Sequence, residues 1–180
     1  MLTFSLQIRH DGLAASNQVP ARLQQHNALL SEFDKKSHRM VHLLLRRLTS
    51  VLKDSYAERV HAAHSHMSSS DTGLKIESVP CVEKLSDVPP SEHTDKGSIT
   101  LLFCEQYTTE VFRPKTHDWI FIAPRPDCAI VNVADSLQAL TDGQLKSSLH
   151  RVGQISPGVK ERLCVLYYLR PCIREYWVLD

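Results

Sequence analysis

The hydrophobic period of the chain changes near residue 71. Between residues 21 and 59, apolar side chains recur mainly at spacings of three and four, which predicts one or two amphipathic helices. After residue 71, short runs rich in Val, Ile and Leu alternate with Asp, Gly and Pro, which predicts strands joined by turns. This order indicates a mainly β fold with α, a sandwich or jelly roll preceded by amphipathic helices. We therefore expect residues 1–70 to form an N-terminal helical segment that packs on a core of residues 71–180.

Seven strands and one short helix are expected in the second part of the chain. The predicted strands are 74–80, 98–104, 109–112, 119–122, 129–133, 150–152 and 162–169, and the predicted helix is 135–141. In the first part, the leucine-rich stripe is expected to be a packing face, with Lys35, Lys36, Arg46 and Arg47 towards water. Residues 1–20 are expected to be irregular.

Composition limits the classes of partner. A chain of 180 residues suits one domain, and 42% hydrophobic residues argue against disorder. A formal net charge of +1 gives no electrostatic reason to expect nucleic acid or an anionic membrane as partner. No apolar run approaches the roughly 20 residues that span a bilayer, and the N-terminus lacks the apolar core of a secretory signal. The odd number of cysteines without a CxxC pair favours reduced thiols. We therefore expect a cytoplasmic protein that binds neither nucleic acid nor membrane.

The stretch His93-Thr94-Asp95 precedes a predicted strand and carries potential metal ligands. Residues two apart on a strand point to the same face, so His93 and Asp95 can reach one ion, and His150 begins a later predicted strand. Two imidazoles and one carboxylate form the facial triad of non-haem Fe(II), which leaves positions open for other ligands. A bare His-x-Asp is more often a solvated turn, and catalytic zinc uses the same ligand types. Spacing alone leaves these alternatives open.

Three more histidines lie between residues 61 and 66. At helical spacing only His61 and His64 share a face, and no carboxylate or cysteine accompanies them. We expect this stretch to be a solvated helix end that runs into a loop rather than a metal site.

Arg162 suggests what would bind beside such an ion. A buried guanidinium is costly unless it meets an anion, and its planar fork suits a carboxylate. An iron with open positions next to an arginine suits a ligand that chelates metal at one end and carries a carboxylate at the other. 2-Oxoglutarate fits this description, although Arg162 on its own would be read as a surface strand residue.

Three stretches carry a family resemblance: HTDKGSITLLF from residue 93, CAIVNVADSLQALTDGQLKSSLHRV from residue 128, and VKERLCVLYYLRP from residue 159. In them the chain resembles the Fe(II)/2-oxoglutarate-dependent oxygenases, specifically the isopenicillin N synthase-like group and its fungal members linked to secondary metabolism. A weaker resemblance extends through GLKIESVP from residue 73.

The resemblance implies a double-stranded β-helix with iron on His93, Asp95 and His150. It also implies that Arg162, with Cys164 two residues later, binds the distal carboxylate of 2-oxoglutarate. The implied activity is that of a dioxygenase, with Fe(II), 2-oxoglutarate and O2, oxidising a small organic, secondary-metabolite-like substrate and releasing succinate. Neither the substrate nor the choice among hydroxylation, desaturation and rearrangement follows from the sequence.

The chain departs from the family pattern at several positions. Cys164 replaces a serine hydroxyl, Val79 replaces a tyrosine that many relatives carry, and Ala134 replaces a common glycine. Phe103, Tyr107 and Phe112 are equally expected in the pocket wall or in the core.

The resemblance also leads us to expect that N- and C-terminal parts of the family pattern are missing, so that a homo- or hetero-oligomer covers the uncovered edges. An alternative function is therefore a shortened, non-catalytic relative that acts as a partner subunit of a full-length oxygenase. A zinc-dependent hydrolase is a third possible function, but the sequence offers no clear general base near the predicted metal ligands.

Overall fold

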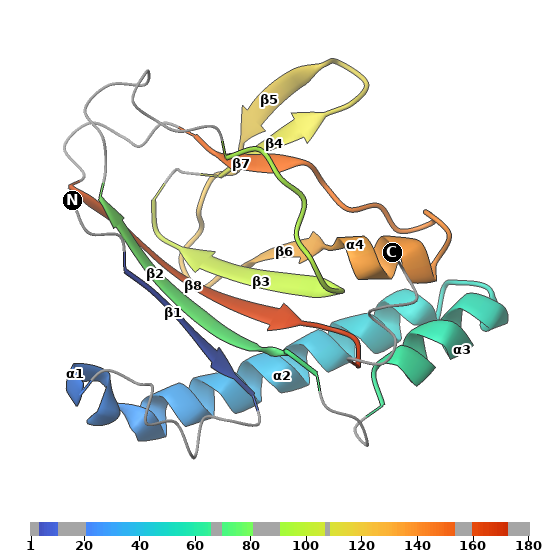
Figure 1. Ribbon diagram of the computed structural model, residues 1–180. Helices are drawn as coiled ribbons and strands as arrows, with labels where there is room; N and C mark the ends of the chain where they lie inside the picture. The colour runs from blue at the N-terminus through green and yellow to red at the C-terminus, as the bar shows by residue number, and fades with distance from the viewer. Residues whose placement is uncertain are drawn as a thin grey trace.

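The computed structural model describes residues 4–10, 21–65, 70–80, 91–106, 109–153 and 160–172. Four helices and eight strands lie in these ranges (Figure 1): β1 (Phe4–Arg9), α1 (Ala21–Gln24), α2 (Asn27–Thr49), α3 (Asp54–Ala63), β2 (Gly73–Pro80), β3 (Ile99–Cys104), β4 (Thr109–Arg113), β5 (Asp118–Phe121), β6 (Ile130–Val133), α4 (Asp135–Leu140), β7 (His150–Val152) and β8 (Glu161–Leu169). All seven predicted strands and the short helix are present, with bounds that differ by at most one residue from the prediction at each end.

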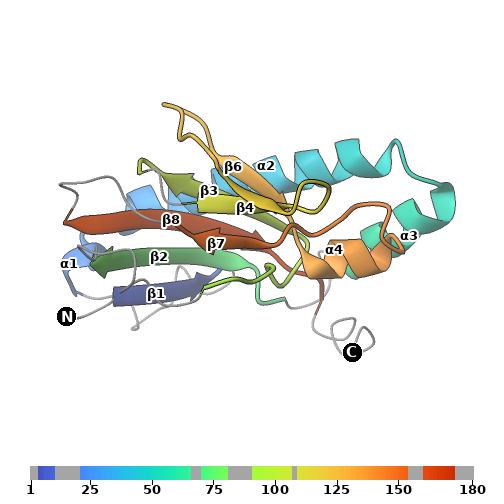
Figure 2. The same cartoon turned by 90° about the horizontal axis from the view of Figure 1, so that it is seen from above.

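The strands form two antiparallel sheets. The larger sheet has the order β1-β2-β8-β3-β6 and the smaller sheet has the order β5-β4-β7. Helix α2 lies along the outer face of the larger sheet, α3 lies at the end of this sheet near α4, and the smaller sheet lies on the other side of the larger sheet (Figures 1 and 2). The predicted mainly β fold with helices packed on one side is confirmed. The division at residue 70 stays a prediction.

Strand β8 shows how alternation builds this arrangement. Tyr167 and Leu169 are buried in the core that the larger sheet shares with α2, and Leu101 on β3 joins them there. The alternate residues Arg162 and Tyr168 face the smaller sheet instead and line a cavity. Because successive side chains of a strand point to opposite faces, one strand supplies both the core and the candidate site.

Helix α2 packs on the sheet with only part of its apolar surface. Val41 and Leu45 are buried in the core, whereas the four predicted basic residues are exposed as expected. The prediction that the whole leucine-rich stripe packs was wrong for four exposed residues, namely Leu29, Met40, Leu43 and Val51. A single sheet face covers only one side of a helix, so the wider apolar arc of this segment stays uncovered by the described residues.

The expectation that residues 1–20 are irregular was wrong for β1. This strand pairs antiparallel with β2, in a register that runs from Phe4 opposite Ser78 to Arg9 opposite Gly73. Its partner lies about seventy residues further along the chain, so local sequence pattern cannot reveal the pairing that stabilises it. Residues 11–20 lie outside the described part of the chain.

The expectation of a solvated helix end after α3 was wrong for His64. Its side chain is buried; Nδ1 donates to the Val60 carbonyl at 2.6 Å, and Nε2 accepts from the Ser98 hydroxyl at 2.8 Å. Burial lowers the pKa of His64 below 6.5, the ordinary value for histidine. His61 is exposed as expected, and His66 lies outside the described residues.

Two expectations from composition concern cysteines and membranes. No disulfide joins Cys104, Cys128, Cys164 and Cys172 among the described residues, and Cys81 lies outside them. Among the helices that the structure describes, none is both long enough and apolar enough to cross a membrane.

Candidate active site

The backbone brings His93 and His150 together. Each residue donates its amide N–H to the carbonyl of the other at 2.9 Å, which forms an isolated antiparallel bridge between the segment before β3 and the start of β7. The two imidazole rings lie with centroids 4.3 Å apart. Residues more than fifty positions apart in the chain therefore present their side chains side by side, at the place where the two sheets meet.

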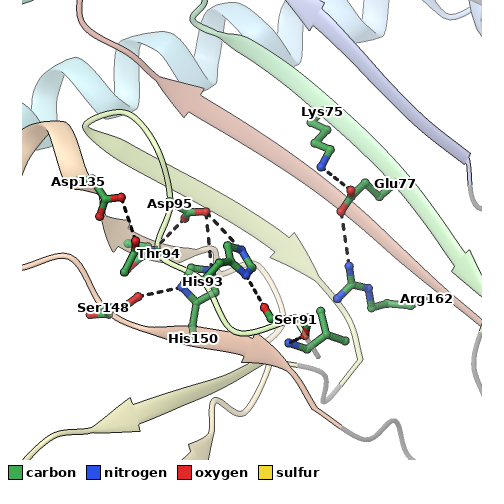
Figure 3. Close-up of polar contacts among 12 residues, drawn as sticks. Lys75, Glu77, Ser91, His93, Thr94, Asp95, Asp135, Ser148, His150 and Arg162 are labelled. Carbon is green, nitrogen blue, oxygen red and sulfur yellow. Dashed lines mark hydrogen bonds and ion pairs between the residues drawn. The ribbon is translucent and has the colours of Figure 1, made fainter. Parts of the chain in front are cut away.

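Asp95 completes the group. Its Oδ1 atom lies 3.9 Å from Nε2 of His93 and 3.7 Å from Nε2 of His150. These separations are too long for hydrogen bonds, yet the three potential ligand atoms all lie within 4.8 Å of one another (Figure 3). Two imidazole nitrogens and one carboxylate oxygen are the donor set of the facial triad, so the three residues fit a non-haem iron.

Backbone carbonyls fix the orientation of both imidazoles. Nδ1 of His93 lies 2.5 Å from the Ser91 carbonyl, and Nδ1 of His150 lies 2.9 Å from the Ser148 carbonyl. A carbonyl can only accept, so each Nδ1 carries a proton, and in the neutral imidazole each Nε2 then keeps the lone pair that can bind a metal. Such orienting hydrogen bonds are typical of metal-binding histidines.

Three neighbouring residues hold the carboxylate and its loop. Asn132 on β6 donates Nδ2–H to Oδ2 of Asp95 at 2.8 Å, and Thr94 donates its hydroxyl to Asp135 at 2.9 Å. The amide of Asp135, the first residue of α4, donates to the Asp95 carbonyl at 2.9 Å. Sequence reasoning missed Asn132, because only the β3–β6 register brings it next to the metal run.

The triad opens into a cavity of about 360 Å³ between the two sheets. This volume suits a small organic ligand. The cavity wall combines the polar groups of the triad with apolar side chains from both sheets, among them Leu102, Val111, Ile122 and Leu166.

Arg162 lies on β8 in the wall of the same cavity and is 9% exposed. Its Nε atom is buried and has no hydrogen-bond partner among the described residues, and its Nη2 lies 3.5 Å from Oε2 of Glu77. A buried donor without a partner is costly, and a carboxylate in the cavity would satisfy it. The side chains present therefore fit a ligand such as 2-oxoglutarate.

Sequence reasoning missed two further charged residues in this wall. Lys75 and Glu77 on β2 line the cavity, with Lys75 Nζ 2.5 Å from Glu77 Oε1. Their spacing of two on a predicted strand was the signal that places both on one face. The spacing indicates a place in the cavity wall only when the β2–β8 pairing, which sets that face beside Arg162, is known.

Cys164 shares the strand face of Arg162 but is buried against another thiol. It lies directly opposite Cys104 in the β3–β8 register. A hydrogen bond with Cys104, together with burial, raises the pKa of the Cys164 thiol well above its ordinary value. Cys164 is absent from the described lining of the cavity, and its contact with 2-oxoglutarate stays a prediction.

The aromatic residues Phe103 and Phe112 were expected either in the pocket wall or in the core. Phe103 packs on the helix side of the sheet, where its ring meets Phe33 edge-on at 5.0 Å between centroids. Phe112 contacts the rings of Trp119 and His117 on the β4–β5 side, and neither phenylalanine lines the described cavity.

Tyr107 and the side chain of Val79 lie outside the described part of the structure. Ala134 adopts a φ of −114°, which any residue can reach, so the loss of glycine there causes no strain.

Comparison with known proteins places this geometry in a family. A family model described as the 2OG-Fe(II) oxygenase superfamily matches residues 73–171. The chain is 30% identical over 164 residues to the 2-oxoglutarate-dependent dioxygenase frbH of Dothideomycetidae sp., covering 90% of this chain and 51% of that protein. It is 32% identical over 157 residues to the 2-oxoglutarate-dependent dioxygenase iboH of Amanita muscaria, covering 85% of this chain and 76% of that protein.

Solved structures share the fold. JOX2, crystallised with 2OG, Fe and JA, superposes with a TM-score of 0.75 at 23% identity over 94% of this chain and 49% of its own. The dioxygenase for auxin oxidation 1 from Arabidopsis thaliana, in a 2-oxoglutarate binary complex, gives a TM-score of 0.71 at 17% identity, covering 96% of this chain and 64% of its own.

The chain thus spans about half the length of frbH and about three quarters of iboH. The family match covers the segments that carry the candidate metal ligands and Arg162, and the relatives include fungal 2-oxoglutarate-dependent dioxygenases, as the sequence resemblance implied. On this evidence the chain belongs to the 2OG-Fe(II) oxygenase superfamily.

Proposed function

We propose that this chain acts as an Fe(II)/2-oxoglutarate-dependent dioxygenase on a small organic substrate of the secondary-metabolite kind, and converts 2-oxoglutarate to succinate and CO2. The observation that carries the proposal is that three convergent metal-ligand atoms and a buried arginine share one cavity. The fungal relatives named as 2-oxoglutarate-dependent dioxygenases support the same activity.

The proposed roles follow from the donor types. His93, Asp95 and His150 would hold Fe(II), which when bound supplies the oxygen-activating chemistry. Arg162 would hold the distal carboxylate of 2-oxoglutarate, with its unpartnered Nε as one of the donors. The side chains of Leu102, Val111 and Ile122 would exclude water and orient the substrate. Cys164 is proposed as a second, weaker contact for the cosubstrate, because it lies two residues beyond Arg162 on the same strand face.

An anaerobic titration tests this function directly. Adding Fe(II) and 2-oxoglutarate to the protein should produce the visible metal-to-ligand charge-transfer absorption, and His93→Ala should abolish it. His117→Ala is the matched control, because His117 is exposed on the β4–β5 turn and does not line the cavity. Folded wild-type protein that shows no absorption would overturn the proposal.

A partner-subunit function is the second candidate. The observation that favours it is the exposed apolar set on and after α2, which the described chain leaves uncovered. We propose a homo- or hetero-oligomer in the cytoplasm as the setting in which this surface is covered. Native mass and 2-oxoglutarate turnover, measured on the same sample, separate the two functions. A monomer that releases succinate rules out the non-catalytic reading.

A further inference from the structure

We propose that the Glu77 carboxylate competes with incoming acids for the Arg162 guanidinium, and that it thereby weakens the binding of acids with a distal carboxylate. In the same proposal, Lys75 takes over the Glu77 carboxylate when such an acid binds. The inference rests on the proposed function, because it assigns Arg162 to the cosubstrate. It makes Glu77 and Lys75 residues that set the affinity and selectivity of the cosubstrate end of the cavity.

The strand register brings the three side chains together. Glu77 on β2 lies opposite Cys164 on β8, so Arg162 is its diagonal neighbour two residues along β8. Diagonal neighbours on paired strands are within reach of each other when their side chains are long. Lys75, Glu77 and Arg162 all line the cavity, and Figure 3 shows Glu77 between the two cations.

The two oxygens of Glu77 are divided unequally between its partners. Oε1 lies 2.5 Å from Lys75 Nζ, whereas Oε2 lies 3.5 Å from Arg162 Nη2. The first distance is a short ion pair, and the second is at the limit of a hydrogen bond. Arg162 is therefore the more loosely held of the two cations and the easier one to release.

Burial strengthens the electrostatic interactions within this group of charged side chains. The side chains of Glu77 and Arg162 are 17% and 11% exposed, so solvent screens their interactions less than at the surface. A carboxylate that docks on Arg162 would approach the ionised Glu77, and the two like charges would repel. The Glu77 side chain thus opposes the same acids that Arg162 attracts.

Lys75 lowers the free-energy cost of moving Arg162 from Glu77 to an incoming acid. If Arg162 turned to an incoming acid and Glu77 had no other partner, a mostly buried carboxylate would be left unpaired, which is strongly unfavourable. Lys75 already contacts Glu77, so the carboxylate keeps a partner throughout. The group can therefore exchange one carboxylate for another without leaving a charge uncompensated.

The test compares two 2-oxo acids on Glu77→Gln and wild-type protein. Anaerobic Fe(II) protein is titrated with 2-oxoglutarate or with 2-oxopentanoate, which has the same chain length but no distal carboxylate, and dissociation constants are read from the absorption and from calorimetry. We expect Glu77→Gln to bind 2-oxoglutarate roughly tenfold more tightly, because a like charge has been removed. Its affinity for 2-oxopentanoate should be unchanged.

Two further variants sharpen the result. Lys75→Met should weaken 2-oxoglutarate binding, and by a larger factor with Glu77 present than in the Glu77→Gln background, because Glu77 then turns fully to Arg162. Glu161→Gln is the matched control: Glu161 is the exposed carboxylate next to Arg162 in the chain, and it does not line the cavity. Its affinity for both acids should equal that of wild type. Glu77→Ala should repeat the tightening if Glu77→Gln folds poorly.

The outcomes separate this inference from the proposed function. If wild type binds 2-oxoglutarate and Glu77→Gln binds it equally or more weakly, the inference is wrong and the function stands. Equal tightening for both acids also overturns the inference, because Glu77 would then act on the metal end. No absorption from any variant with either acid overturns the function, and the inference falls with it.

Discussion

At the scale of single residues, the two oxygens of Asp95 face different partners. Oδ2 accepts a hydrogen bond from Asn132, and Oδ1 points towards the two imidazoles. Asn132 therefore selects which oxygen is presented to an ion, in the way that carboxylate and amide groups behind metal ligands commonly do.

Replacing Asn132 tests this role. Asn132→Leu keeps the approximate size but removes the donor, so Asp95 can rotate, and Fe(II) affinity should fall about 10- to 100-fold. The affinity is measured by anaerobic Fe(II) titration. Gln144→Leu, at an exposed position after α4, should leave it unchanged. Unchanged metal affinity in Asn132→Leu would show that the hydrogen bond does not orient the ligand.

His64 predicts a pH dependence of stability. Its neutral form donates to Val60 and accepts from Ser98, and burial lowers its pKa below the ordinary 6.5. The unfolded state therefore binds more protons below pH 6.5, so His64 contributes its full stability above that pH and loses it as the pH falls further. The free energy of unfolding from urea titrations between pH 7.5 and pH 5 should decline less steeply in His64→Asn than in wild type. The exposed control His117→Asn should keep the wild-type slope.

At the scale of elements, the start of α4 locks the metal-binding loop. The amide of Asp135 donates to the Asp95 carbonyl and the amide of Ser136 donates to the Gly97 carbonyl, at 2.9 and 2.7 Å. Gly97 has a φ of +106°, and a Cβ there would lie 2.9 Å from the Leu169 carbonyl oxygen on the neighbouring strand. Loop, helix and β8 therefore approach too closely at this point for any side chain.

Two glycine substitutions distinguish the stability cost of a positive φ from the added cost of a steric clash. Gly143→Ala has a φ of +76° in open space, so it should cost about 1 kcal/mol of the free energy of unfolding. Gly97→Ala meets both the strained φ and the Leu169 carbonyl, so it should cost more, about 2 to 4 kcal/mol. Urea unfolding measures both variants. Equal costs would mean that the loop moves away from β8 without penalty.

At the scale of the whole molecule, β1 is tied to α2 through a buried carboxylate. Asp34 on α2 is 2% exposed, and its Oδ2 lies 2.5 Å from Nδ1 of His10, the residue after β1. The His10 ring also stacks on His38, which bonds the hydroxyl of the core residue Tyr167 at 2.7 Å. This contact joins the edge strand, the long helix and the centre of the sheet.

Removing His10 should weaken this junction. His10→Ala leaves the buried Asp34 carboxylate without that partner, so the free energy of unfolding should fall by about 1 to 3 kcal/mol. Arg9→Ala is the neighbouring control: its ion pair with Asp71 is exposed, with N and O 3.5 Å apart, and should change stability by less than about 1 kcal/mol. If both variants lose the same stability, β1 is held by its backbone pairing alone.

Local pattern was enough to predict the elements that build the fold. The period-two runs from residue 74 onwards located seven strands, and the helical spacing before them located α2 and α3, because both signals lie within a few consecutive residues. The same local reading failed for β1, whose stability comes from pairing with a distant strand.

The sequence by itself determined the candidate ligands and the family, because His93, Asp95, His150 and Arg162 all stand in long stretches that resemble one family. Only the tertiary structure decided what surrounds them. Asn132 behind Asp95, and Lys75 and Glu77 beside Arg162, come from strands whose contact depends on register across the sheet. The physical reason is that residue type specifies what a side chain can bind, whereas pairing between segments far apart in the chain specifies which groups it meets.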